Sequence, residues 1–327
     1  MISKILLFTF IYFSWKYLSE FIKSNSLNKK IVPSMDYFFA FSPTSLFSVW
    51  TLTALGFYIG GFSNDIIPQW ELNFNIKIFL LFLSLAFITS SSLFINEKNI
   101  SELSLNNQKI DKISKILLLV SLFLLLFTNI YNFFLGLALY YLIRIYKRET
   151  SLKSKLNQYL IQCLIGFLLF LSGFFIAITG NNYFYFEISN LVYSTYIIII
   201  SILCCFCMIL SYENQKKNSN FEINKRNINS ISLLLLLIVL VTALKINEPL
   251  LAICSACSIP FYIFAFFRNL NKDLKRTFIY PLFIFNFFIS TIYPYLGISI
   301  IFIFYISKYY YWHRFDKNYP TFLVKND

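Results

Sequence analysis

The chain has few of the charged side chains that cover a soluble protein. Only 13% of its residues are charged, compared with about 25% in a typical soluble domain. Hydrophobic residues make up 58%, and the mean hydropathy is +0.66. A chain this apolar has too little polar surface to dissolve as a globule. The composition therefore predicts an integral membrane protein with no soluble domain.

Metal-binding and nucleophilic side chains are also scarce. His313 is the one histidine, and all six cysteines lie within apolar segments. Cys254 and Cys257 have CxxC spacing, but neither a second cysteine pair nor a histidine accompanies them. We therefore expect neither a zinc site nor a Cys–His nucleophile pair, and we interpret the cysteines as small helix-packing residues. The sequence identifies no catalytic residue.

The apolar segments predict an all-α protein with about nine or ten transmembrane helices. Lys16 and Glu20 interrupt the first 22 residues, which are interpreted as a short span or an interfacial helix. No small-residue cleavage site follows them, so we do not expect a removed signal peptide. The predicted spans are about 44–62, 76–95, 116–128, 130–147, 159–179, 191–212, 232–246, 249–267, 278–292 and 295–312.

Basic residues fall in alternate gaps between these spans. The gaps contain 24 of the 28 Lys and Arg residues, whereas the opposite gaps contain only Lys77 and Lys245, both at span edges. Positive residues accumulate on the cytoplasmic side of membrane proteins. We therefore expect the basic gaps and the C-terminus to be cytoplasmic. The net charge of +13 is explained by this distribution, and no nucleic-acid partner is expected.

The spans are organised as an internal repeat. Each predicted repeat contains four helices, with a long polar cytoplasmic loop after its second helix and a tight turn between its short third and fourth helices. No convincing residue identity connects the halves. The predicted parts are an N-terminal hydrophobic or interfacial segment (1–37), a transmembrane bundle (38–312) with repeats at about 44–147 and 159–267 and terminal helices at 278–312, and a cytoplasmic tail (313–327).

The two polar loops, 96–115 and 213–231, are the candidate functional segments. Both begin where a helix leaves the apolar bundle, and both mix carboxylates, amides and ammonium groups. Such a set could bind a diphosphate, with carboxylates acting through Mg²⁺ and lysines acting directly. The alternative is a pair of solvated loops with ordinary positive-inside lysines. The candidate residues are Asn96, Glu97, Lys98, Glu213, Asn214, Lys216 and Lys217.

This arrangement resembles the UbiA superfamily of intramembrane prenyltransferases. Four helices, four further helices and a ninth, with polar loops after the second and sixth, are similar to the family's topology. The segment from Phe41 to Leu46 (FSPTSL) is similar to the R-P-x-x-L-like segment that precedes the first core helix in the family. The resemblance covers about residues 38–292.

The family's first loop has an N-D-x-x-D-x-x-x-D motif. Asn96 matches its Asn and Glu97 replaces the first Asp, whereas Ile100 and Ser104 occupy the other two acidic positions. Glu102 lies nearby but out of register. In the second loop, with a D-x-x-x-D-like motif, Glu213 replaces the first acid and Lys217 occupies the second position.

The resemblance implies transfer of an isoprenyl group from a prenyl diphosphate to an acceptor, with Mg²⁺ as cofactor. Glu97 and Glu213 would bind the metal and Asn96 would support the ligands. Lys98, Asn214, Lys216 and Lys217 would contact the diphosphate. Two carboxylates can hold one Mg²⁺ together with waters and phosphate oxygens. A second ion would lack carboxylate ligands. The alternative is therefore a degenerate member of the family, with altered chemistry or none.

Two other functions remain open from the sequence. The missing acids favour a non-enzymatic protein that binds a lipid or stabilises a partner protein. The repeats would also suit a transporter of small molecules or lipids. Few carboxylates interrupt the spans, however, so a transporter would lack the usual ion relay.

Overall fold

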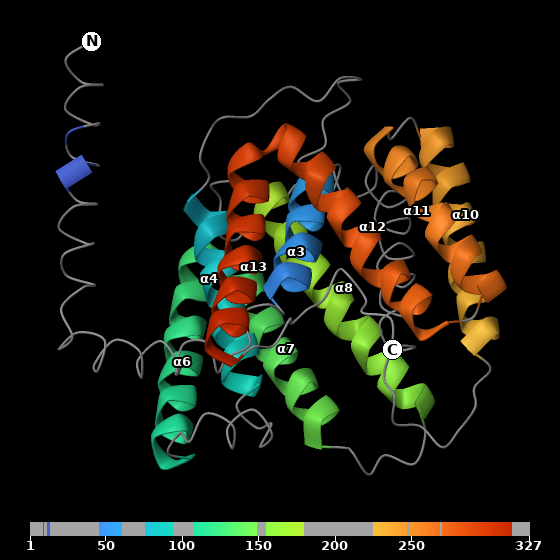
Figure 1. The fold of residues 1–327 in the computed structure, drawn as a ribbon. Helices are drawn as coiled ribbons and strands as arrows, with labels where there is room; N and C mark the ends of the chain where they lie inside the picture. Colours follow the sequence, from blue (N-terminus) through green and yellow to red (C-terminus); the bar gives the residue numbers. More distant parts are fainter. Residues whose placement is uncertain are drawn as a thin grey trace.

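The computed structural model describes an all-helical bundle (Figure 1). It describes residues 46–60, 76–93, 107–148, 155–179, 225–246, 249–268 and 270–315, together with Thr9, Tyr12 and Phe13. The helices are α3 (Leu46–Gly60), α4 (Ile76–Leu93), α6 (Asn107–Thr128), α7 (Ile130–Arg148), α8 (Lys155–Thr179), α10 (Lys225–Ile246), α11 (Pro249–Arg268), α12 (Asn271–Ile292) and α13 (Pro294–Phe315).

These helices confirm the all-α class, and each coincides with one predicted span. The predicted span at 191–212 lies outside the described residues. The prediction of short third and fourth helices is wrong, because α6 and α10 each contain 22 residues. Their first turns, and those of α12, are polar and precede the apolar residues. A hydropathy criterion therefore places the helix start several residues too late.

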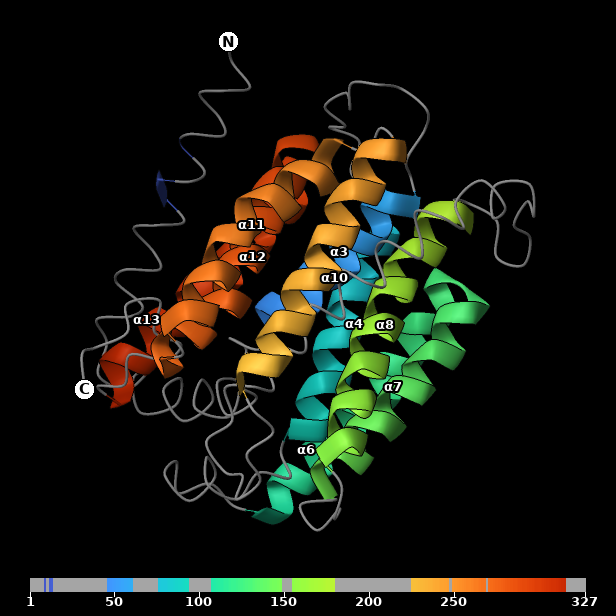
Figure 2. The same cartoon turned by 90° about the vertical axis from the view of Figure 1, so that its right-hand side faces the viewer.

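The described helix ends next to the basic gaps lie at one end of the bundle. The end of α4, the start of α6, the end of α7 and the starts of α8 and α10 all lie there (Figures 1 and 2). We call this the basic end. The corner between α11 and α12 and the end of α13 lie at the same end. The α6–α7 turn lies at the opposite end.

A single residue, Asn129, separates α6 from α7 and is fully buried. Its Oδ1 accepts a hydrogen bond from the backbone N–H of Asn132 at 2.7 Å, which caps the first turn of α7. Its Nδ2 donates to Oγ1 of Thr179 at the end of α8, at 3.3 Å. The tight turn is thereby joined to the second half of the chain.

Helix α3 is the central helix of the bundle. It contains no charged residue, and 12 of its 15 residues are buried. It contacts α4, α8, α12 and α13, and the ribbon shows it enclosed by them (Figure 1). A helix that is apolar on every face is expected at such a buried position.

The closest helix pair, α3 and α8, depends on glycine. A Cβ atom on Gly56 would lie 1.9 Å from the carbonyl oxygen of Phe170, and one on Gly173 would lie 1.9 Å from the carbonyl oxygen of Thr53. A Cβ on Gly60 would lie 2.8 Å from the Cβ of Ala177. Both helices therefore present small residues four positions apart, which lets their backbones approach closely.

This crossing reveals residue identity between the two halves that the sequence analysis missed. Residues 56–60 of α3 read GFYIG, and residues 173–177 of α8 read GFFIA. The contacts are reciprocal, because each glycine faces the carbonyl one turn before the other glycine. Helices α3 and α8 are the first helices of the two predicted repeats, and their reciprocal contact is compatible with that prediction. Helices α6 and α10, and α7 and α11, follow at corresponding positions along the chain.

The last two helices complete the bundle. Tyr293 alone connects α12 to α13, and its backbone N–H donates to the carbonyl of Ile289 at 2.8 Å. Phe47 of α3, Phe283 of α12 and Phe304 of α13 form one aromatic cluster, with ring centroids 4.6 to 5.7 Å apart. The predicted terminal helices are thus present, and α13 packs across the junction of α3 and α12.

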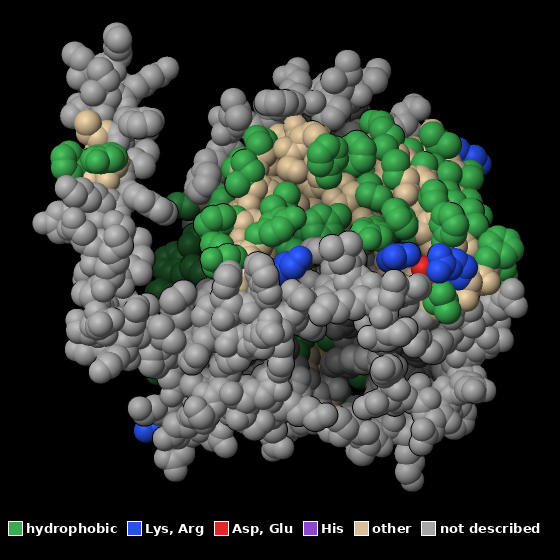
Figure 3. Space-filling view, in the orientation of Figure 1, with side chains coloured by type: hydrophobic (Ala, Val, Ile, Leu, Met, Phe, Trp, Pro, Cys, Tyr) green, Lys and Arg blue, Asp and Glu red, His purple; other side chains and the backbone are tan. Residues whose placement is uncertain are grey.

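Apolar side chains cover much of the described surface in the view of Figure 3. Exposed examples include Phe123 on α6, Phe134 on α7, Phe264 on α11 and Phe302 on α13, each about three-fifths exposed. Within the described residues, α11 is the one helix that is long and apolar enough to cross a membrane by length and composition. Shorter apolar segments occur in α3, α4, α7, α8, α10, α12 and α13.

Candidate functional site

The first candidate segment connects two helices that pack side by side at the basic end. Helix α4 ends at Leu93 and α6 begins at Asn107. The Oγ of Ser114 on α6 donates to the backbone carbonyl of Ser91 on α4 at 2.8 Å. This bond joins the two helices close to the point where the segment leaves and re-enters the bundle.

The second candidate segment leads into the start of α10 at the same end. Helix α10 runs antiparallel to α11, and the Nδ2 of Asn229 donates to the backbone carbonyl of Tyr262 at 2.9 Å. Asn229 lies about one turn after the start of α10, and Tyr262 lies fewer than two turns before the end of α11. The start of α10 and Arg268, at the end of α11, therefore lie at about the same height along the bundle.

The predicted site residues themselves lie outside the described residues. This applies to Asn96, Glu97 and Lys98 in the first segment, and to Glu213, Asn214, Lys216 and Lys217 in the second. Their proposed contacts stay predictions. The structure describes α4 and α6 on either side of the first segment and α10 after the second, and it places the end of α4 and the starts of α6 and α10 at the same end of the bundle (Figure 1).

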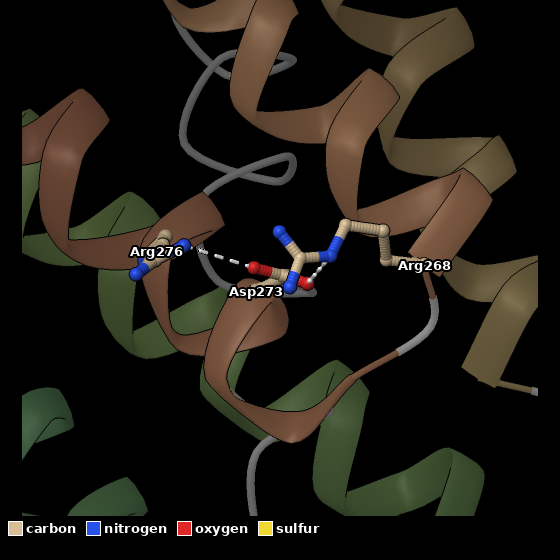
Figure 4. A network of polar contacts seen from close by, with 3 residues as sticks. All are labelled: Arg268, Asp273 and Arg276. Carbon is tan, nitrogen blue, oxygen red and sulfur yellow. Dashed lines mark hydrogen bonds and ion pairs between the residues drawn. The ribbon is translucent and has the colours of Figure 1, made fainter. Parts of the chain in front are cut away.

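A polar cluster that the sequence analysis did not identify lies at the corner between α11 and α12 (Figure 4). The carboxylate of Asp273 is 2% exposed and faces two arginines. Nη1 of Arg276 donates to Oδ1 at 3.0 Å, and Nε of Arg268 lies 3.2 Å from Oδ2. The sequence analysis counted these arginines only as positive-inside residues. The i,i+3 spacing of Asp273 and Arg276 was the signal that could have revealed the pair.

Metal-ligating side chains do not gather in the described part of the chain. No three His, Cys, Asp or Glu side chains there lie close enough together to hold an ion. Cys254 is buried in the core and Cys257 is exposed, and both are free thiols. The predicted Mg²⁺ ligands, Glu97 and Glu213, are outside the described ranges.

Two buried amides lie inside the bundle. Asn132 on α7 and Asn286 on α12 are 1% and 0% exposed, and amides inside membrane bundles normally bond across helices. Among the described residues, neither the Oδ1 nor the Nδ2 atom of either residue has a hydrogen-bond partner. The fully buried Oγ of Ser255 on α11 likewise has no partner among them.

Comparison with known proteins identifies the fold. No family model matches the chain, and no curated protein matches it. Two solved structures do match. A digeranylgeranylglyceryl phosphate synthase, studied in membranes, is 16% identical with a TM-score of 0.52, and the match covers 84% of this chain and 99% of that one.

The second structure is a UbiA homolog from Archaeoglobus fulgidus bound to Cd²⁺. It is 16% identical with a TM-score of 0.51, and the match covers 81% of this chain and 99% of that one. The resemblance inferred from topology is thus confirmed at the level of the fold, which is UbiA-like. Because an identity this low establishes architecture alone, the activity must be argued from the site.

Proposed function

We propose that this protein is a UbiA-like membrane prenyltransferase, which moves an isoprenyl group from a prenyl diphosphate to an acceptor. One observation carries the proposal. The end of α4 and the starts of α6 and α10, which adjoin the two polar segments, lie at one end of a bundle with a UbiA-like fold. The carboxylates, amides and lysines of these segments would therefore face a diphosphate at the same membrane surface.

A membrane location is supported by three facts. The fold is shared with a synthase studied in membranes, apolar side chains cover much of the described surface in Figure 3, and the described helix ends next to the basic gaps lie at one end. By the positive-inside rule the basic end faces the cytoplasm. A prenyl diphosphate would then lie with its chain among the helices and its charged group at that end.

Some residues of the two segments would bind the metal ion, and others would bind the diphosphate. Glu97 and Glu213 would hold one Mg²⁺, with Asn96 supporting them, and a divalent ion is consistent with the Cd²⁺ bound by the UbiA homolog. Lys98, Asn214, Lys216 and Lys217 would hold the diphosphate oxygens. When bound, Mg²⁺ would neutralise charge on the leaving diphosphate.

The reaction breaks the bond between C1 of the isoprenyl chain and the diphosphate oxygen. The bonding electron pair leaves with the diphosphate. The acceptor's nucleophilic atom forms the new bond to C1 and gives up its proton. The lysine side chains would stabilise the departing charge, since ammonium groups bind phosphate oxygens strongly when water is excluded.

A second candidate is a non-enzymatic lipid-binding protein on the same fold. The observation that favours it is the set of residues at the family's acidic positions. Ile100, Ser104 and Lys217 cannot ligate Mg²⁺ as aspartate does. Lysine would then bind the diphosphate directly, but a flexible ammonium group orients a leaving group less well than a metal.

Thermal unfolding of the purified protein with a prenyl diphosphate distinguishes these candidates. A ligand at a hundred times its dissociation constant stabilises the folded state by about 2.7 kcal/mol. We expect this stabilisation with Mg²⁺ and its loss with EDTA. The matching isoprenoid alcohol, which lacks the diphosphate, is the control. Stabilisation that persists in the presence of EDTA would favour the second candidate. No stabilisation in a folded sample would contradict both candidate functions.

A further inference from the structure

The cluster of Arg268, Asp273 and Arg276 has more positive charge than its position in the fold requires. A buried carboxylate needs a partner, and one arginine supplies it. Here two arginines face the single carboxylate (Figure 4), which leaves a net positive charge. Lys272 and Lys275 adjoin the cluster in the sequence.

Both arginines also keep unused hydrogen-bond donors. Nε of Arg268 forms an ion pair with Oδ2 of Asp273, and no described residue accepts a hydrogen bond from its two terminal nitrogens. Nη1 of Arg276 donates to Asp273, whereas its buried Nε has no partner among the described residues. The side chains of Arg268 and Arg276 are 47% and 38% exposed. The two guanidinium groups therefore flank one carboxylate, and part of each remains open to an acceptor from outside (Figure 4).

The surroundings of the cluster are suited to a lipid. On the space-filling surface a red acidic atom flanked by blue basic groups lies beside green apolar side chains (Figure 3). Phe264 and Phe267, on the last turns of α11 before Arg268, are 61% and 72% exposed, and Leu270 is 42% exposed. Apolar contacts for a chain and donors for a headgroup thus lie next to each other.

We propose that Arg268 and Arg276, held in place by Asp273, bind the phosphate group of a membrane lipid at the basic end. Planar guanidinium groups match phosphate oxygens in geometry as well as charge. Basic sites between helices at the cytoplasmic membrane surface bind anionic headgroups. The phosphate could belong to a phospholipid of the bilayer or to the prenyl diphosphate of the proposed function, since both present the same oxygens.

The test measures lipid binding to the full-length purified protein, with phosphatidylglycerol as the anionic probe and phosphatidylcholine as the zwitterionic one. We expect Arg268→Gln to weaken phosphatidylglycerol binding about ten-fold and to leave phosphatidylcholine binding unchanged. Arg276 still pairs Asp273 in this variant, so the buried carboxylate keeps a partner and the corner stays folded. Arg268→Lys keeps the positive charge but loses the planar guanidinium group. Its affinity for phosphatidylglycerol should lie between those of the native protein and Arg268→Gln.

Arg144→Gln is the matched control. Arg144 lies on the last turns of α7 at the same end of the bundle, so this variant removes an equal charge away from the cluster. It should bind phosphatidylglycerol as the native protein does. Equal losses for Arg144→Gln and Arg268→Gln would show a diffuse electrostatic effect and overturn the proposal. Native affinity in Arg268→Gln for every phosphate lipid tested would also overturn it.

A parallel titration with a prenyl diphosphate distinguishes the two sources of phosphate. A loss for phosphatidylglycerol alone assigns the cluster to a bilayer phospholipid. A loss for the prenyl diphosphate alone assigns it to the substrate of the proposed function, and a loss for both assigns it to a shared headgroup position. If the native protein binds no prenyl diphosphate, the proposed function fails, while the phosphatidylglycerol titration still decides this proposal.

Discussion

Replacing Gly173 with alanine is expected to destabilise the folded protein by about 3 kcal/mol, the upper end of the usual cost of overpacking. The new Cβ would lie 1.9 Å from the carbonyl oxygen of Thr53 and 2.9 Å from the backbone nitrogen of Phe57. Both are backbone atoms of the buried central helix, so relief requires α3 and α8 to move apart. Gly56→Ala should cost a similar amount, because its Cβ would meet the carbonyl of Phe170 at the same distance.

Thermal unfolding of the variants in detergent measures this effect, with Gly136→Ala as the control. A Cβ on Gly136 of α7 would lie 2.2 Å from Cδ1 of Leu125, which is the end of a flexible side chain and can rotate away. Gly136→Ala should therefore lower stability much less. If Gly173→Ala unfolds at the same temperature as Gly136→Ala, the close crossing of α3 and α8 is wrong.

Glu97→Gln and Glu213→Gln are each expected to abolish Mg²⁺-dependent binding of a prenyl diphosphate. Only these two carboxylates match the acidic positions of the two motifs. An amide keeps the shape of the side chain but removes the charge that Mg²⁺ requires. The stabilisation of about 2.7 kcal/mol expected at saturating ligand should therefore disappear in both variants.

Glu102→Gln is the control for these variants. Glu102 lies in the same segment as Glu97 but out of register with the motif. This variant should keep the Mg²⁺-dependent stabilisation, which separates a specific ligand from a general loss of negative charge. Unchanged binding in both Glu97→Gln and Glu213→Gln would contradict the site assignment.

The architecture could be predicted from the sequence because it depends on patterns that hydropathy records. Apolar length located the helices, and alternating basic gaps indicated which helix ends meet, as α4, α6 and α10 do at the basic end. The polar first turns of α6 and α10 were missed, since a helix continues for several residues beyond its apolar part. The start of such a helix depends on packing more than on hydropathy.

Contacts between helices could not be predicted in the same way. The small residues at Gly56, Gly60, Gly173 and Ala177 are unremarkable within apolar sequence, and only the crossing of α3 and α8 shows why they recur. The position of Asp273 likewise could not be predicted, because the sequence around it indicates only a basic gap between two spans. Its burial between two arginines depends on how α11 and α12 meet.

The candidate site was predicted from composition and motif register, which describe residue types and spacing but not position in space. Glu97 and Glu213 are therefore predicted as ligands from the sequence alone. The described helix ends next to their segments, the end of α4 and the starts of α6 and α10, lie at one end of a UbiA-like bundle. Whether the two carboxylates bind one ion is decided by the binding measurements on their variants.

The most direct test of prenyl transfer follows the isoprenyl group itself. The purified protein is incubated with Mg²⁺, a prenyl diphosphate labelled in its isoprenyl chain, and a membrane lipid extract as the source of acceptors. The account predicts that label appears in a new lipid while free diphosphate is released in equal amount, and that EDTA or Glu97→Gln stops both. Label that stays in the bound prenyl diphosphate, with Mg²⁺ and acceptors present, would contradict a transferase and favour the lipid-binding protein.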